Sequence, residues 1–232
     1  MTIDDVVTKT GITLAVLSVV AVISYFLVSA NLALAMPLTL IGGLGGLVLV
    51  LIATFGRKQD NPAIVLSYAA LEGLFVGAVS FIFANVVVSG ANAGVLISQA
   101  VLGTIGVFFG MLVVYKTGAI RVTPPKFTRM IVAGMVGVLV LILGNFVLAM
   151  FGVGGGEGLG LRSGGPIAIA FSLFVIALAA FSFLIDFDAA DQMIRAGAPE
   201  KAAWGGVALG LTVTLVWLYI EILRLLSYFQ QR

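Results

Sequence analysis

The chain alternates long uncharged, mainly apolar stretches with short segments that contain charged residues. The uncharged stretches have 47, 43, 27, 23 and 19 residues and cover 10–56, 73–115, 130–156, 163–185 and 202–220. A helix needs about 20 apolar residues to cross the hydrocarbon core of a bilayer. The first stretch is therefore long enough for two helices. The second is also long enough for two when it is extended back through Glu72 to Pro62, and each of the others holds one.

This pattern predicts seven transmembrane helices. We expect them over 11–30, 34–55, 63–88, 95–115, 129–151, 166–192 and 202–228. The strands of a membrane barrel are shorter and alternate apolar with polar residues, so these long and uniformly apolar runs favour helices. The predicted fold class is an all-α polytopic membrane protein in which residues 1–232 form a single transmembrane domain.

The composition agrees with this fold class and excludes several other classes of protein and site. Hydrophobic residues make up 61% of the chain, and the 12 basic and 10 acidic residues are far fewer than in soluble proteins, where about a quarter of residues are charged. Because the chain has no Cys and no His, disulfides, thiol nucleophiles, Cys/His zinc sites and Ser-His triads are excluded. We expect no catalytic residues, no enzymatic activity and no cofactor. The scattered net charge of +2 does not suit nucleic-acid binding.

The basic residues predict the orientation of the helices. Nine are expected on the side of the N-terminus: Lys9, Arg57, Lys58, Lys116, Arg121, Lys126, Arg129, Arg195 and Lys201. Three are expected on the other side: Arg162, Arg224 and Arg232. Because basic residues gather in cytoplasmic loops, we expect a multi-pass protein of the cell membrane with a cytoplasmic N-terminus. The acidic start of the chain does not fit a signal peptide, so the first helix is expected to remain.

Four acidic residues, Glu72, Asp186, Asp188 and Glu221, fall inside the predicted helices, and Asp191 lies at the border. A charge in hydrocarbon costs about 3 kcal/mol or more, so such residues usually line a protein interior or a water path. Counted at about 1.5 Å per residue, Glu72 lies about 15 Å from the start of its helix at Pro62. If the helix over 166–192 continues to Arg195, Asp186 lies about 14 Å and Asp188 about 10 Å from that end. These three acids therefore lie at similar depths, whereas Glu221 is expected near the outer face.

Carboxylates at one depth suggest a common chemistry. Acids that share a site titrate as a coupled set, and their oxygens are the hard ligands that Ca²⁺ prefers. We assign no resident metal site and consider Ca²⁺ as a transported ion. Asp186 and Asp188 are two residues apart, about 200° around a helix, so only one of them can fully face a given cavity. The pattern is typical of a proton-sensitive cation path.

The same residues also allow a structural interpretation. The three aspartates would then form the interfacial end of their helix, with Asp191 paired to Arg195 four residues later. Glu221 would form an interfacial ion pair with Arg224. Glu72 does not fit this interpretation, because it lies within a helix with no basic residue one turn away. We therefore expect Glu72 to have a buried role.

Two segments resemble the Bax inhibitor-1 family of seven-helix membrane proteins. The pair Phe187-Asp188 resembles the Phe-Asp at the end of the family's sixth helix, and residues 68–77, with Gly73 and Gly77 four apart, resemble its third helix. The last predicted helix matches in length and pattern. The resemblance covers the whole chain and implies a bundle with helix seven at its centre, wrapped by the other six. It also implies a pH-sensitive calcium leak.

The resemblance also implies that two aspartates control the calcium leak, one on the sixth helix and one on the seventh. Asp188 matches the first of them, and Asp186 is a close competitor. Aligned without gaps, Thr214 occupies the position of the second. The chain is therefore expected to lack one acid of the pair.

We expect Glu72 to take the place of this missing acid, with Glu221 as the alternative. The family resemblance further implies a basic residue after the second helix that acts as a latch. Arg57 or Lys58 matches that position.

These observations lead to a functional hypothesis. We expect a pH-sensitive passive leak channel for calcium or another cation, in contact with the lipid bilayer. The alternative is a non-conducting membrane regulator of a membrane protease or of a stress response, which would bind a membrane protein through an exposed basic segment such as residues 116–129. A third hypothesis is a proton-coupled transporter.

Overall fold

The computed structural model of the chain describes residues 1–56, 58–88, 93–120 and 126–230. The helical elements in chain order are α1 (Ile3–Ala30), η1 (Leu32–Leu34), α2 (Ala35–Phe55), α3 (Pro62–Phe81), η2 (Ile82–Val87), α4 (Ala93–Thr117), α5 (Lys126–Met150), η3 (Val153–Gly156), α6 (Pro166–Arg195), η4 (Trp204–Leu209) and α7 (Gly210–Gln230). Over these described ranges, seven helical segments are long and apolar enough to cross a membrane. The predicted all-α, seven-helix fold class is confirmed.

Several helices extend past the predicted ends, which had been placed at charged residues. α1 begins at Ile3 rather than near residue 11, because Thr2 caps it: the Thr2 side chain accepts from the Asp5 backbone, and the Asp5 carboxylate accepts from the Thr2 backbone at 2.7 Å. α6 continues past residue 192 to Arg195, whose guanidinium pairs with Asp191 in the last turn. Charges mark where a helix leaves hydrocarbon, whereas capping decides where the helix itself ends.

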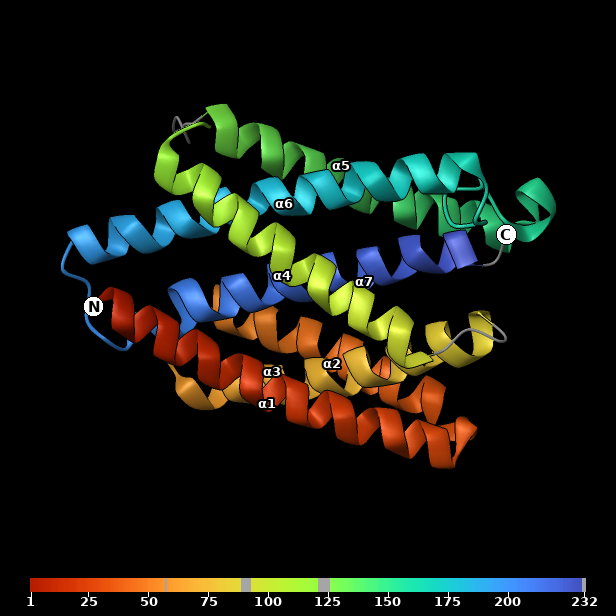
Figure 1. Cartoon of the computed structure of the whole chain (residues 1–232), viewed down its shortest axis with the longest axis horizontal. Coiled ribbons are helices and arrows are strands. Elements are labelled where there is room, and N and C mark those ends of the chain that lie inside the picture. Colours follow the sequence, from red (N-terminus) through yellow and green to blue (C-terminus); the bar gives the residue numbers. More distant parts are fainter. Residues whose placement is uncertain (57, 89–92, 121–125, 231–232) are drawn as a thin grey trace.

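The seventh span lies at the centre of the bundle, as expected. In its most apolar stretch 72% of the residues are buried, a larger share than in any other described span. α7 contacts α1, α3, α4 and α6, while α2 packs mainly on α3 and α5 on α6. Figure 1 shows α7 running through the middle of the bundle, with α1 to α3 on one side, α5 and α6 on the other, and α4 crossing in front of it.

Glycines allow α1 and α2 to approach α3 closely. An added Cβ at Gly73 would lie 2.6 Å from the Leu17 carbonyl oxygen on α1. On the other side of α3, an added Cβ at Gly42 of α2 would lie 2.6 Å from the Leu71 carbonyl oxygen. The hydrophobic effect does not drive helices together in lipid, so membrane helices associate through close van der Waals packing. Small residues at the contacts allow this packing. The three N-terminal spans therefore form one tightly packed unit.

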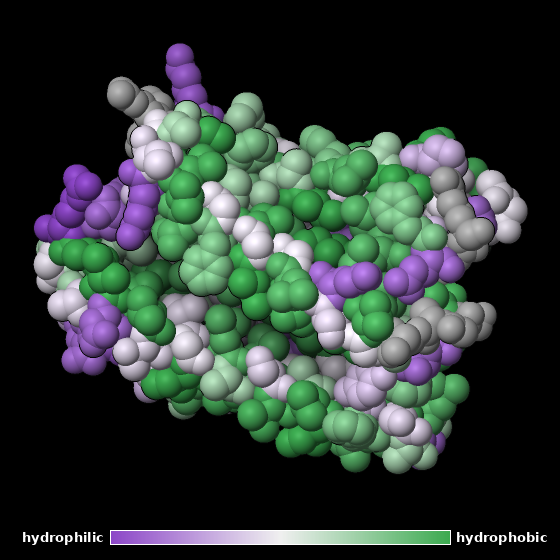
Figure 2. All heavy atoms as spheres, in the orientation of Figure 1, coloured by the Kyte–Doolittle hydropathy of each residue, from purple (hydrophilic) through white to green (hydrophobic). Residues whose placement is uncertain are grey.

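The surface fits a protein embedded in lipid. In Figure 2 apolar side chains cover the middle of the visible face, and hydrophilic residues gather mostly toward its two ends. The N-terminus and the α6–η4 turn lie at one end, and the chain leaves α7 at the other (Figure 1). This division gives two membrane sides, which we name the N-terminal side and the opposite side.

Candidate functional site

A hydrogen bond joins α6 to the central helix inside the membrane-spanning region. The Thr214 hydroxyl on α7 donates to the Asp186 carboxylate on α6 at 2.8 Å. One turn earlier on α7, an added Cβ at Gly210 would lie 3.3 Å from the other carboxylate oxygen of Asp186. Because Gly210 has no side chain, the carboxylate lies directly against the backbone of α7. The structure thus brings Asp186 and Thr214 together.

The other two aspartates of α6 bond to their own helix. Asp188 accepts a hydrogen bond from the Gln192 side chain at 2.6 Å. Asp191 pairs with Arg195 at 2.7 Å, the i,i+4 pairing considered from the sequence. Within the described part of the chain, no hydrogen bond joins Asp188 to α7. Asp186 is therefore the acid of this cluster that contacts the central helix.

Glu72 lies at the contact between α3 and α2. Its carboxylate faces Gly46, where an added Cβ would lie 2.6 Å from Oε2. The side chain is partly buried, and it forms no hydrogen bond or ion pair with the residues that the structure describes. Gly46 therefore provides the space that an unpaired carboxylate occupies. Whether Glu72 acts together with the acid on α6 stays a prediction.

A buried ion network surrounds Glu221 on the opposite side of the membrane. Glu221 is only 2% exposed and pairs with Arg162 at 2.7 Å, while the Ser172 hydroxyl donates to the same carboxylate oxygen at 2.6 Å. Arg224, the partner considered from the sequence, lies farther away at 3.7 Å. The Arg162 guanidinium also lies over the Phe171 ring, 5.2 Å from its centroid. The network fastens the segment before α6 to the central helix.

The pairing of Arg162 with Glu221 could not be predicted from the sequence, because Arg162 lies in a glycine-rich connection far from Glu221 along the chain. Arg162 is separated from Glu221 by 59 positions and Ser172 by 49. The available signal was Glu221 itself, an acid inside an apolar helix with Arg224 three residues later. A buried carboxylate needs compensating partners, but the sequence does not say which ones the fold supplies.

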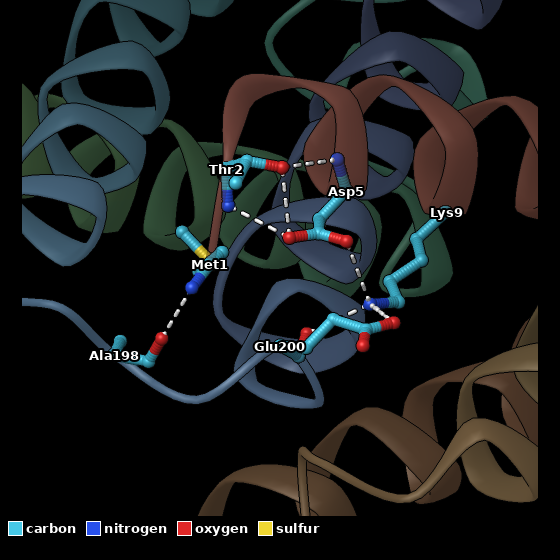
Figure 3. A network of polar contacts seen from close by, with 6 residues as sticks. All are labelled: Met1, Thr2, Asp5, Lys9, Ala198 and Glu200. Carbon is cyan, nitrogen blue, oxygen red and sulfur yellow. Dashed lines mark hydrogen bonds and ion pairs between the residues drawn. The ribbon is translucent and has the colours of Figure 1, made fainter.

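A second polar network ties the start of α1 to the α6–η4 turn on the N-terminal side (Figure 3). The Lys9 ammonium is buried at 7% exposure and donates to the Glu200 carbonyl oxygen at 2.8 Å and to its carboxylate at 2.9 Å. Asp5 lies 3.7 Å from the same ammonium. The Met1 nitrogen donates to the Ala198 carbonyl oxygen at 2.6 Å. From the sequence, Lys9 was expected only to be one of the basic residues on the cytoplasmic side. Its contacts with Glu200 and Asp5 were not predicted.

The latch candidates follow α2. Arg57 lies outside the described residues. Lys58 is exposed and forms no ion pair with the part of the chain that the structure describes. Nor do any three acidic side chains among the described residues converge as ligands for a metal ion.

The fold and these buried groups define a polytopic membrane protein with ionisable side chains arranged around a central seventh helix. The model of the family described as Bax inhibitor 1 like matches residues 1–231, essentially the whole chain. The chain belongs to this family. A search of curated proteins gave no match.

Proposed function

We propose that this protein is a pH-sensitive passive leak for Ca²⁺ or another cation in the cell membrane, with its N-terminus in the cytoplasm and no enzymatic activity. The observation that carries the proposal is the hydrogen bond from Thr214 to Asp186. In this bond a partly buried acid lies at the contact between α6 and the central helix. Intramembrane carboxylates are costly and usually serve an ion or proton path.

The chemistry of this pair supports a response to pH. An ionised Asp186 attracts a cation and accepts the Thr214 hydrogen bond. A protonated Asp186 loses its charge and gains a donor of its own, whereas Thr214 cannot change its charge. One proton therefore alters both the local field and the bond between α6 and α7. In this proposal Asp186 carries the switch, and Thr214 holds its carboxylate at the helix contact.

Glu72 is the second acid of the proposal. Its unpaired carboxylate against Gly46 supports this role, because a partly buried acid without a partner in the described chain is free to accept a proton or to contact a cation. Glu221 is the weaker candidate, because Arg162, Ser172 and Arg224 already surround its carboxylate. The latch role of Arg57 or Lys58 remains a proposal from the family resemblance.

Cation flux into liposomes tests the proposal. Purified protein is reconstituted into vesicles that contain a Ca²⁺ indicator, and uptake is followed at acidic and neutral pH. Asp186→Asn should lose the pH dependence, with flux at both pH values close to that of the unmodified protein at acidic pH. Asp188→Asn is the matched control on the same helix and should retain the pH dependence. Equal behaviour of both variants and the unmodified protein would exclude Asp186 as the switch.

The alternative function is that of a non-conducting regulator of a membrane protease or stress response. Exposed basic side chains on both sides of the α4–α5 connection favour it: Lys116, Lys126 and Arg129. Such a surface suits an acidic region of a membrane protein partner. Vesicles with protein that take up no more Ca²⁺ than protein-free vesicles at either pH would support this alternative over the leak.

A further inference from the structure

A groove opens between α1 and α4 toward the lipid. Its volume is about 600 Å³, and its floor is formed by residues of α3 and α7, including Gly77, Ser80 and Tyr219. Its walls include Ala21 on α1 and Ile97 on α4. Figure 1 shows α1 and α4 on the near side of the bundle, diverging in front of α3 and α7. The rims carry exposed apolar side chains, and this face of the molecule is mainly apolar in Figure 2.

Several polar groups of the floor and walls have partners inside the protein, and the exposed hydroxyls of Ser18 and Ser98 also line the groove. Ser80 donates to the Val76 carbonyl oxygen at 2.6 Å and shares a hydrogen bond with the Tyr219 hydroxyl at 2.8 Å. The Thr104 hydroxyl donates to the Ala100 carbonyl oxygen at 2.8 Å. None of the described lining residues is charged. A buried water needs two to four polar partners, so this lining suits hydrocarbon better than water.

The length and position of the groove match one leaflet of a bilayer. On α1 the lining runs from Leu14 to Phe26 and on α4 from Gly94 to Ile105. At about 1.5 Å per residue these segments span about 18 and 16 Å, close to half of the roughly 30 Å hydrocarbon core. α1 ends and α4 begins on the side opposite the N-terminus, so the groove runs from the membrane middle toward that side.

We propose that this groove binds one acyl chain of a phospholipid from the leaflet opposite the N-terminus. The groove is continuous with the lipid-facing surface of the seven spans, so lipid is the solvent at its open side. Its volume lies within the range of about 300–1,000 Å³ that is usual for mainly apolar ligand sites. The absence of charge among its described lining residues favours a hydrocarbon chain over a headgroup or a polar peptide. The bound chain contacts α7 at Leu215, next to Thr214.

Photo-crosslinking tests this site. Purified protein is reconstituted with phosphatidylethanolamine that carries a diazirine in its acyl chain, and labelled peptides are mapped after illumination. Lipid around any membrane protein labels its outer surface, so the informative residues are Val216 and Tyr219 on the floor of the groove. These should be labelled by the acyl-chain probe and not by the same lipid with the diazirine on its headgroup.

Filling the groove provides the matched variants. Ala21→Phe places a ring in the groove, whereas Val19→Phe places the same ring on a surface residue that does not line it. Floor labelling should fall to the headgroup-probe background in Ala21→Phe and stay unchanged in Val19→Phe. Val101→Trp narrows the groove from its exposed α4 rim and gives the same test if Ala21→Phe does not fold. Floor labelling that persists in the filled variants, or that is absent from the unmodified protein while its outer surface is labelled, would overturn the proposal.

Discussion

The Glu72 carboxylate on α3 occupies the space that Gly46 leaves open on α2. An added Cβ at Gly46 would lie 2.6 Å from Oε2 of Glu72, closer than real Cβ contacts come. The absence of a side chain on one helix therefore decides where an acid on the next helix can lie. This relationship makes the position of Glu72 open to a direct test.

Compared with the control Gly137→Ala, Gly46→Ala should be less stable by about 1 kcal/mol or less, because the added methyl meets the free end of the flexible Glu72 side chain, which can move at a small cost. Gly46→Ala combined with Glu72→Ala should recover most of the loss, since the clashing carboxylate is then gone. Thermal unfolding in detergent measures both effects. Gly137→Ala on α5 is the control, because an added Cβ there meets nothing within 4 Å. If the double variant is no more stable than Gly46→Ala alone, Glu72 is not the group that Gly46 accommodates.

Thr214→Val keeps the shape of the side chain and removes the hydroxyl that bonds Asp186. The loss should cost about 1 kcal/mol of stability, because the partly buried Asp186 carboxylate loses a hydrogen-bond donor, and it should change the pH profile of cation flux. Thr214→Ser should restore both properties. Thr212→Val is the matched control, because the Thr212 hydroxyl donates to the Ala208 carbonyl oxygen, which lies in the same continuous helical span. A pH profile that is the same in Thr214→Val and the unmodified protein would remove Thr214 from the switch.

Glu221→Gln should destabilise the protein by about 1–3 kcal/mol, because it leaves the partly buried Arg162 guanidinium without its acidic partner. In a double-mutant cycle with Arg162→Met, the combined loss should be clearly smaller than the sum of the two single losses. Thermal unfolding of the four proteins gives the coupling energy. Asp191→Asn serves as a control at an exposed ion pair, where we expect little change. Additive losses at Glu221 and Arg162 would show that the two residues do not act as a pair.

The chain has no cysteine, which makes its topology simple to test. Single cysteines at Ala119 and Ala198 should react with a membrane-impermeant thiol reagent only when it is applied from the cytoplasmic side. A cysteine at Glu157 should react only from the opposite side. The prediction follows from the larger number of basic residues on the N-terminal side. Labelling of Ala119 and Glu157 from the same side would contradict the seven-span topology.

The sequence by itself determined the number and approximate position of the membrane spans. Each span must be about 20 apolar residues long whatever its neighbours are, because the bilayer sets its length. The sequence also identified which acids lie within the long apolar helices. It placed helix ends less well, because it took them from charged residues, whereas capping by Thr2 begins α1 at Ile3.

Only the tertiary structure decided which groups meet. Asp186 and Asp188 are two residues apart on one helix, and the position of α7 alone determines that Asp186 contacts Thr214 while Asp188 bonds Gln192. Likewise, Arg162 reaches Glu221 because the segment before α6 folds back over the central helix. Hydropathy is a local property of each span, whereas these contacts depend on how the helices rotate and pack. The physical reason is that the hydrocarbon core requires each span to be apolar whatever its neighbours are, whereas the packing between helices determines which side chains meet.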